Sequence, residues 1–508
     1  MTRPRLRSTR RMGCCVTVGA ICALLLALPT PAAAQFFDPS FNATTNGAVH
    51  AIAVQADGKV IIGGAFTQVN AVTHGHLARL NADGSLDAAF TTGVTVGANV
   101  WAVAVTSDGH ILVGGDFTQL GGVAKTRIAR LMPDGSIDPA FTTTANFTVD
   151  VMLVQPDGKI LVGGGFSQIN GTARNGLARL NADGTLDGAF APSFNNSVFA
   201  LALQADGAIV VGGIFGTVNG ISRIYLARLN GGGSLDTNFS PLAINRGGAN
   251  FVNAVAVKAD GHILVGGRMT FQAPSAETRD FLAQLDGTDG SLDLSFNVPV
   301  VGGNLIDSVV PLADGRFLIG GNFNNVDGIN TYAAARLFPN GAFDSSFDTA
   351  GGGTTTNLVE TMVVQPDQKV MVGGTLGLTN IARLLPNGPF TDQTLTSGLT
   401  VIKAVHITEL RQRVDAARLG KGLTVFPWTD PTLTPGVTVV KALHIEELRT
   451  ALADAYIAGG AAPPIYTDPM LSGGATVVQA AHIVELRNAL LVIETTALQV
   501  PQGLQDQR

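Results

Sequence analysis

The sequence predicts a mainly β protein: a seven-bladed β-propeller closed by an N-terminal strand, followed by a small α-helical module of three repeats. Three observations predict it. One strand-rich unit of about 50 residues occurs seven times, a spare copy of its last strand precedes the first unit, and the period then changes to 38 residues. The composition agrees, because 62 of the 508 residues are glycine and only 14% are charged, as in chains of many short strands joined by glycine turns.

The N-terminal segment, residues 1–34, is predicted to be a secretory signal peptide. It carries five arginines, then an apolar run over residues 12–28, then small residues up to Ala34 that suit cleavage. The alternative is a membrane anchor, but the run is shorter than the roughly 20 residues that span a bilayer. All three cysteines, Cys14, Cys15 and Cys22, lie in this segment. We therefore expect a mature chain that lacks disulfides and a transmembrane segment and is secreted, on the cell surface or in the periplasm.

The charge of the mature chain narrows its partners. Removing the five arginines changes the formal net charge from −6 to −11, which disfavours nucleic acid and anionic lipid. We expect instead a protein or glycan partner of the cell envelope or the extracellular space. The chain has only 2 Trp and 4 Tyr, so aromatic platforms for sugars are few.

Each repeat contains an Asp-Gly turn followed six positions later by a Gly-Gly pair. In the first repeat, residues 49–54 and 59–66 are two antiparallel strands around the turn at 55–58. Residues 77–80 form a third strand and residues 85–90 a fourth, after a polar middle loop. Four strands in about 50 residues match one propeller blade. The turn aspartates are Asp57, Asp108, Asp157, Asp206, Asp260, Asp314 and Asp367, and the glycine pairs begin at Gly63, Gly114, Gly163, Gly212, Gly266, Gly320 and Gly373.

The fourth-strand segments are displaced by one unit relative to the other strands. A segment over residues 37–41 precedes the first repeat, and no good copy follows the seventh. A spare strand at the start and a vacancy at the end match a ring that the N-terminus closes, and they argue against an open solenoid. The segments end at Phe41, Phe90, Phe141, Phe190, Phe239, Phe296 and Phe347.

Two phrases of the repeat carry a family resemblance. They are VQPDGKILVGGGF at residues 154–166 and LARLNADGTLD at residues 177–187, and both recur in register. They resemble the bacterial delta-60 repeat, and the resemblance covers about residues 37–387. It implies a secreted or surface β-propeller and supplies neither an agreed activity nor catalytic residues. The seventh repeat departs most, because it lacks most of the middle loop at residues 375–380.

One arginine recurs at a fixed position of the third strand. A ring of arginines could bind an anionic ligand, but one cation per blade more often ties neighbouring blades together, here through a fourth-strand aspartate. We therefore interpret these arginines, the turn aspartates and the glycine pairs as structural. The arginines are Arg79, Arg130, Arg179, Arg228, Arg336 and Arg383, with Gln284 in the fifth repeat, and the fourth-strand aspartates are Asp87, Asp138, Asp187, Asp236, Asp293 and Asp344.

The repeats contain no sequence signature of catalysis or of a bound cofactor. The turn at residues 81–87 has oxygen-bearing side chains at alternate positions, as a calcium loop does, but it lacks the distal glutamate and favours a plain hairpin turn. His74 and His76 share one loop without an acidic neighbour in sequence, so a solvated loop is favoured over a metal site. Calcium is the one cofactor that the sequence leaves open.

The C-terminal module, residues 389–497, repeats with a period of 38 and precedes a polar tail at residues 498–508. Each copy runs through a threonine N-cap into a helix, such as the one expected over residues 439–456. A histidine and a glutamate three residues apart on each helix could hold a metal, and a helix-surface hydrogen bond is the ordinary alternative. The caps are Thr400, Thr438 and Thr476, and the candidate ligands are His406, Glu409, His444, Glu447, His482 and Glu485.

These observations favour an exported propeller, residues 35–388, that binds or scaffolds other molecules without catalysis and uses its helical repeats for anchoring or self-association. One alternative is an extracellular enzyme, a glycan lyase or hydrolase, with its site at the propeller channel or on the middle loops. A second alternative is a calcium-stabilised structural surface protein. If the protein is an enzyme, we expect non-repeated polar residues to cluster on one face of the propeller. The segments that depart from the repeat, and are therefore candidates, are residues 74–76, 268–279 and 324–332.

Overall fold

The computed structural model describes residues 38–384 and 402–496. Excepted within these ranges are residues 39, 91–97, 242, 245–249, 302–304, 332, 345–346, 348–357, 377–378, 420, 422, 431–432, 434–438 and 469–477. The predicted signal peptide, Phe37 of the spare strand, the three threonine caps and the polar tail lie outside the described residues.

The first repeat forms a three-stranded antiparallel sheet from β1 (Val49–Val54), β2 (Val60–Gly64) and β5 (Leu77–Leu80), in the order β1-β2-β5. The turn after β1 forms because the Gln55 N–H donates to the Lys59 carbonyl oxygen and Gly58 adopts a φ of 82°, which glycine tolerates best. Every residue of β2 is buried, which explains its unbroken apolar run. These three strands lie where the sequence pattern predicts them.

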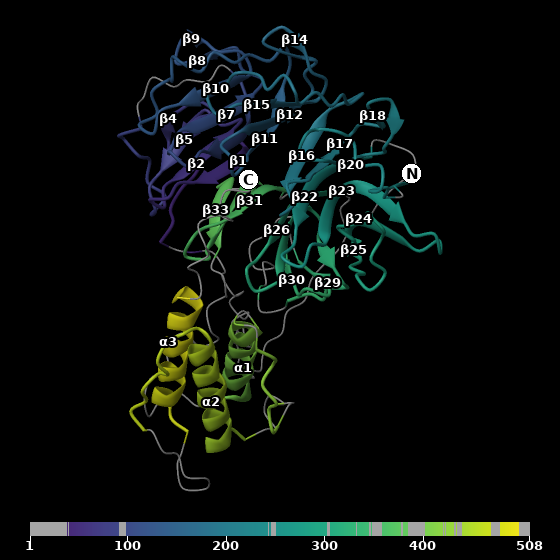
Figure 1. Ribbon diagram of the computed structural model, residues 1–508. Helices are drawn as coiled ribbons and strands as arrows, with labels where there is room; N and C mark the ends of the chain where they lie inside the picture. The colour runs from purple at the N-terminus through teal and green to yellow at the C-terminus, as the bar shows by residue number, and fades with distance from the viewer. Residues whose placement is uncertain are drawn as a thin grey trace, which may run out of the picture. The chain divides into compact units, whose positions relative to one another are not determined.

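The later repeats form six further sheets within the described residues, and they follow one another in chain order (Figure 1). The mainly β class is therefore confirmed. The second to fourth sheets consist of β6 (Val100–Val105), β7 (Ile111–Gly115) and β10 (Ile128–Leu131); β11 (Val149–Val154), β12 (Ile160–Gly164) and β15 (Leu177–Leu180); and β16 (Val198–Leu203), β17 (Ile209–Gly213) and β20 (Leu226–Leu229). The fifth to seventh consist of β21 (Ala243–Ile244), β22 (Phe251–Val257), β23 (Ile263–Gln272) and β24 (Thr278–Leu285); β26 (Leu305–Pro311), β27 (Phe317–Asn322) and β30 (Ala334–Leu337); and β31 (Leu358–Val364), β32 (Val370–Thr375) and β33 (Ile381–Leu384).

The middle loops contain short hairpins that their polar composition did not predict. In the first repeat β3 (Gln68–Val69) pairs with β4 (Val72–Thr73) across a turn in which Asn70 and Ala71 have positive φ. The equivalent pairs are β8 (Gln119–Leu120) with β9 (Val123–Ala124), β13 (Gln168–Ile169) with β14 (Thr172–Ala173), β18 (Thr217–Val218) with β19 (Ile221–Ser222), and β28 (Asn325–Val326) with β29 (Ile329–Asn330). A further strand, β25 (Val300–Val301), pairs with β28.

The predicted fourth strand, residues 85–90, is not a regular strand. Leu86 makes a single antiparallel bridge to Leu80. The Ala89 N–H then donates to the Asp87 carboxylate at 2.9 Å, and the Phe90 N–H donates to the Asp87 carbonyl oxygen at 3.1 Å. These local bonds turn the chain away from the sheet, so the ladder ends after one residue.

Each glycine of a pair lies where another part of the backbone or a neighbouring sheet comes very close. A Cβ on Gly63 would lie 2.4 Å from Cγ1 of Val100 in the next sheet. A Cβ on Gly64 would lie 2.1 Å from the Ala48 carbonyl oxygen. A side chain at either position would push apart neighbouring sheets or paired strands, so both positions require glycine.

The apolar core of the β region lies between successive sheets. Within the described residues, seven clusters of buried side chains each draw mainly on two sheets. The cluster around Phe41 and Val49 also includes Met371 and Ile381 of the seventh sheet. The first strands of the sheets contact one another in order, and β31 also contacts β1, beside which it lies in Figure 1.

The C-terminal module contains α1 (Ala404–Leu419), α2 (Ala442–Ala458) and α3 (Ala480–Thr496), each in contact with the other two (Figure 1). Ile407, Ile445 and Ile483 are fully buried in one shared apolar cluster. Helix α2 begins three residues later than predicted, because the ring of His444 accepts the Lys441 N–H and caps the helix there. None of the helices in the described ranges is long and apolar enough to cross a membrane.

Candidate functional site

The recurrent arginines make the same set of contacts in most repeats. Arg79 donates from Nε to the Asp87 carboxylate at 2.8 Å, and its guanidinium lies 4.8 Å from the centre of the Phe90 ring. Its Nη1 donates to the Pro133 carbonyl oxygen in the turn of the next repeat at 2.5 Å. The guanidinium thus joins two repeats.

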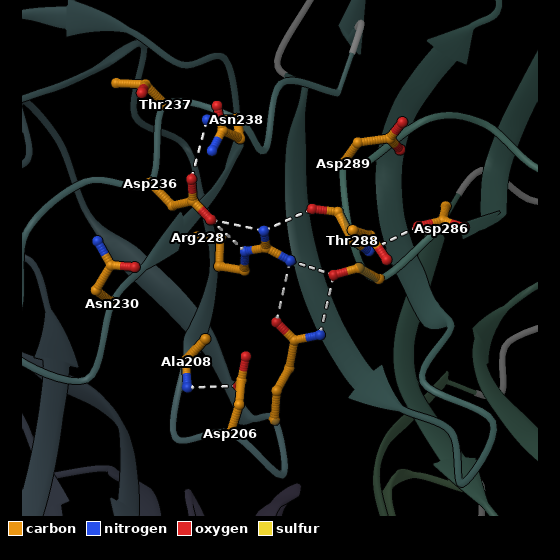
Figure 2. Close-up of polar contacts among 12 residues, drawn as sticks. Asp206, Ala208, Arg228, Asn230, Asp236, Thr237, Asn238, Asp286, Thr288 and Asp289 are labelled. Atoms are coloured by element: carbon orange, nitrogen blue, oxygen red, sulfur yellow. Dashed lines mark hydrogen bonds and ion pairs between the residues drawn. The ribbon is translucent and has the colours of Figure 1, made fainter.

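Arg228 makes the corresponding polar contacts with its own repeat and with the next one, as Figure 2 shows. Its Nη2 donates to the Asp236 carboxylate of its own repeat and to the Thr288 carbonyl oxygen of the next, both at 2.6 Å. Arg130, Arg179 and Arg383 likewise donate both to an aspartate and to a carbonyl oxygen in a turn of another repeat. Arg336 pairs with Asp344 at 2.7 Å, and Gln284 replaces the arginine by donating to Asp293 at 2.7 Å.

The aspartates that hold these arginines have a second cationic partner in several repeats. Lys159 Nζ and Arg179 Nε lie 3.0 Å and 2.9 Å from the same oxygen of Asp187. Burial raises the pKa of Asp187, but hydrogen bonds from Lys159, Arg179 and the Ala189 N–H, together with the charge of Arg179, leave the pKa below its ordinary value. This carboxylate is therefore ionised and fully used in stabilising the repeat.

The turn aspartates and the two loop histidines also serve the backbone. Asp57 accepts the Lys59 N–H at 3.1 Å, and Asp83 in the calcium-like turn accepts both the N–H and the hydroxyl of Ser85. The rings of His74 and His76 each contact a backbone carbonyl oxygen. In the part of the chain that the structure describes, no group of three or more His, Cys, Asp or Glu side chains is placed to hold a metal ion.

The histidines and glutamates of the helical repeats separate into two structural roles. His444 accepts the cap N–H of α2 through Nδ1, and its Nε2 lies 3.0 Å from Asp430. Glu447 accepts the Thr429 N–H at 2.8 Å and pairs with Arg411 of α1 at 2.8 Å. The equivalent contacts of the other repeats are His482 with Asp468, Glu485 with Thr467 and Arg449, Glu409 with Arg487, and the ring of His406 with the Lys403 N–H. All six candidate ligands therefore make hydrogen bonds or ion pairs within the helical module.

A cavity of about 640 Å³ lies where the first strands of the seven sheets come together. The second residue of the repeated first-strand motif is an extra residue without a partner on the adjacent strand, because the strand register shifts there in every repeat. Such a β-bulge redirects a side chain and is common beside functional sites. The seven bulge residues all line the cavity: His50, Trp101, Asp150, Phe199, Asn253, Asp307 and Glu360.

His50 is held firmly in the cavity wall. Its Nδ1 lies 2.5 Å from the Glu360 carboxylate, and its ring stacks on Trp101 with centroids 4.1 Å apart. The His50 side chain is only 9% exposed, and its buried Nε2 has no hydrogen-bond partner among the described residues. The wall therefore contains an oriented imidazole nitrogen whose hydrogen-bonding capacity is unused.

Two aspartates of the wall are poorly compensated. Within the part of the chain that the structure describes, Asp307 accepts a hydrogen bond from Asn253 at 2.6 Å, and its buried Oδ2 has no partner. Burial raises the pKa of Asp307 to about 7, and the Glu360 carboxylate adds to the rise. Burial likewise raises the pKa of Asp150 to about 6, with a smaller contribution from Asp116. Perturbed carboxyl groups in a cavity are typical of functional sites.

The sequence contains a signal for this cavity at one position of the first strand of each repeat. The first strands repeat a small and apolar pattern, but the second position of the motif changes chemical type from copy to copy. The departures at residues 74–76, 268–279 and 324–331 do not line the cavity. Arg279, for example, donates to the carbonyl oxygens of Phe296 and Leu294. Variation at one fixed position of a repeat, rather than variation in loops, marks the candidate site.

Solved structures with similar backbones include three at low sequence identity. The extracellular domain of a one-component system of B. thetaiotaomicron is 17% identical, with a TM-score of 0.43, over 74% of this chain and 42% of that chain. The WD40 β-propeller domain of Doa1 is 13% identical, with a TM-score of 0.43, over 68% and 95%. Virginiamycin B lyase of Staphylococcus aureus is 14% identical, with a TM-score of 0.38, over 68% and 98%. The chain thus spans less than half of the first of these domains.

A comparison with curated proteins finds no match. Six segments match the model of a family described as a β-propeller domain of unknown function, DUF5122: residues 55–90, 106–141, 155–190, 204–239, 258–296 and 312–347. Each segment runs from the turn after the first strand to the closing phenylalanine, and the name delta-60 repeat stays a prediction. The first six repeats of this chain therefore match a β-propeller family.

Proposed function

We propose that this chain is an exported, seven-bladed β-propeller that binds a ligand in the channel between its blades without catalysis. The observation that carries the proposal is the ring of seven bulge residues, which differ in chemical type while the scaffold around them repeats. A repeated scaffold needs repeated residues for its stability. Residues that differ at one position and converge on one cavity are therefore free to serve a ligand.

Contacts of Asp38 and Phe41 support a closed ring. The Asp38 N–H donates to the Arg383 carbonyl oxygen at 2.8 Å, and Arg383 Nε donates back to the Asp38 carboxylate at 2.8 Å. Arg383 also donates to the carbonyl oxygen of Ala82 in the first repeat at 2.5 Å and lies 5.0 Å from the Phe41 ring. Asp38 and Phe41 thereby give the seventh repeat what Asp87 and Phe90 give the first.

The channel has the size and the lining of a small-molecule site. Ligand pockets commonly enclose about 300 to 1,000 Å³ and combine apolar walls with a few placed polar groups. Here Trp101, Phe199 and Phe251 supply apolar surface, and Asp307 and His50 supply unused hydrogen-bonding atoms. The ligand could be free or the end of an envelope protein or glycan.

Export and the role of the helices complete the proposal. The predicted signal peptide at residues 1–34 supports a secreted, cell-surface or periplasmic protein. The helical repeats are proposed to serve anchoring or self-association through apolar side chains on their surface. Val439, Ile457, Ile465 and Val492 are all more than half exposed there.

Trp101 offers a direct test of the channel as the binding site. The chain has 2 Trp, Trp101 in the cavity wall and Trp428 in the helical module, so Trp428→Phe leaves Trp101 as the only reporter. This variant would be titrated with fractionated envelope glycans, envelope peptides and small metabolites. We expect at least one fraction to change the Trp101 emission in a saturable manner.

The matched control for this titration is Trp101→Phe, which keeps Trp428 as the reporter. A fraction that binds the channel changes the emission of the first variant and not that of the second. If every fraction leaves Trp101 unchanged, or acts equally on both variants, the proposal is wrong.

A glycan hydrolase or lyase with its site in the channel is the second candidate function. The observation in its favour is that Asp307, with a pKa of about 7, remains partly protonated near neutral pH, as a general acid must, while Asp150 has a pKa raised to about 6. Turnover of chromogenic glycosides, or absorbance of an unsaturated lyase product, would support an enzyme if Asp307→Asn abolishes it. Saturable binding without turnover supports the binding role.

A further inference from the structure

We propose that the ligand of the channel is an organic cation: a primary ammonium or guanidinium group carried on an apolar body. The inference rests on the proposed function, because it names the ligand class of the same cavity. Its basis is the combination of charge, unused acceptor atoms and aromatic surface in the wall.

The charge of the cavity wall favours a cation. Three carboxyl groups, those of Asp150, Asp307 and Glu360, line the cavity, whereas His50 is the only basic side chain among the lining residues and no Lys or Arg is present there. His50 and Glu360 already pair with each other. The two aspartates are left without a cationic partner inside the wall, so a ligand with a positive charge would compensate them.

The unused polar atoms of the wall are acceptors. When His50 donates its Nδ1–H to Glu360, its Nε2 carries a lone pair and needs a donor. The Oδ2 atom of ionised Asp307 also accepts, and it is buried without a donor among the described residues. An ammonium or guanidinium group supplies several N–H donors and no acceptor, so it matches the hydrogen-bonding need of both atoms.

The rest of the wall suits the carbon skeleton of such a ligand. Trp101 stacks against His50, and Phe199 and Phe251 lie edge to face with centroids 6.4 Å apart. Aromatic faces attract a cation and bury the apolar atoms attached to it. A ligand with a charged amine and an aromatic or aliphatic body would therefore contact both halves of the wall.

Binding should be coupled to the release of protons. The titratable groups around Asp307 are Glu360 and, beyond it, His50, whereas Asp116 is the charged neighbour of Asp150. A bound cation favours the ionised carboxylates and lowers their raised pKa values. The affinity for a cation should therefore increase as the pH rises through about 6 to 7, where Asp150 and Asp307 lose their protons.

A matched set of three probes tests the inference on the full chain with Trp428→Phe. The probes are 2-phenylethylamine, 2-phenylethanol and phenylacetate, which share an aromatic body and carry a positive, a neutral and a negative polar end. We expect the amine to change Trp101 emission with an affinity at least about tenfold above that of the other two, as a charge-assisted hydrogen bond implies. Asp307→Asn and a shift from about pH 8 to about pH 5 should each weaken the amine about tenfold or more.

The outcomes separate the ligand class from the site. If the alcohol or phenylacetate binds the channel as tightly as the amine, the cation inference is wrong and the channel remains a binding site. If none of the three probes changes the emission of Trp101, the cation inference is also wrong. The titration with envelope glycans, envelope peptides and small metabolites then tests the proposed function by itself. An amine affinity that is unchanged by Asp307→Asn would contradict the assigned contact.

Discussion

Asp187 and Asp307 belong to copies of one repeat and meet opposite environments. Asp187 occupies a repeated position, where Lys159 and Arg179 lie within 3.0 Å and its pKa falls below the ordinary value. Asp307 occupies the variable bulge position, where one buried oxygen has no partner among the described residues and burial raises its pKa to about 7. We therefore expect the repeated carboxylate to contribute to stability and the variable one to reduce it.

The largest effect is expected where a repeated ion pair is most buried. Arg336 and Asp344 have side chains that are each 2% exposed, and Arg316 contacts the same carboxylate. Asp344→Asn would leave buried positive charge uncompensated, so we expect the free energy of unfolding to fall by about 3 to 5 kcal/mol in urea denaturation. Asp57→Asn, in a turn where the side chain is 58% exposed, is the control and should change little. A small effect of Asp344→Asn would contradict the claim that the repeated ion pairs stabilise the fold.

A slightly smaller effect is expected for Asp38→Asn, which tests the proposed closure of the ring. Asp38 receives hydrogen bonds or ion pairs from Arg383, Lys369 and Ser40. If it acts as the seventh copy of Asp187, the variant should lose about 2 to 4 kcal/mol of unfolding free energy. Thermal melting of the full chain measures the loss. A melting temperature equal to that of the unchanged protein would mean that Asp38 does not complete the seventh repeat.

The smallest effect is expected in the helical module, where the repeated Glu447 should behave as a structural residue. Glu447→Gln keeps an acceptor for the Thr429 N–H but removes the charge that pairs with Arg411. We expect a loss of about 1 to 2 kcal/mol in the unfolding of the helices, followed by circular dichroism, and no change in channel binding. The neighbouring Glu446→Gln, on the exposed face, is the matched control. A change in channel binding would contradict a purely structural role.

Local pattern predicted most of the strands, because each strand depends on its own alternation and turn. Residues 49–54 and 77–80 were predicted and observed as β1 and β5. The prediction of a fourth strand was wrong, because the Asp87 side chain accepts the backbone N–H of Ala89 in place of a neighbouring strand. Hydrophobic alternation does not reveal such a bond. The start of α2 differed for a similar reason, since the His444 ring accepts the Lys441 N–H that caps the helix.

The candidate site was much less predictable than the fold. The repeated arginines were visible in the sequence because repetition itself marks them. The structure shows which aspartate each one contacts, and for five of the six it also shows the carbonyl oxygen in another repeat. The seven cavity residues lie about 50 residues apart and meet only when the sheets assemble around one cavity. The bulge that directs His50 or Asp307 inward is a shift of strand pairing, which depends on the neighbouring strand rather than on local pattern.

The most direct test of this account compares Asp187→Asn with Asp307→Asn in urea denaturation at about pH 8 and about pH 4. The raised pKa of Asp307 means that its ionisation lowers stability as the pH rises from its unfolded value of 3.8 through about 7. At about pH 8 we therefore expect Asp307→Asn to increase the unfolding free energy by about 1 to 3 kcal/mol and Asp187→Asn to decrease it by a similar amount. At about pH 4 the gain from Asp307→Asn should vanish, because folded Asp307 is already protonated there. A loss of stability in both variants at about pH 8 would contradict the distinction between repeated structural residues and variable channel residues.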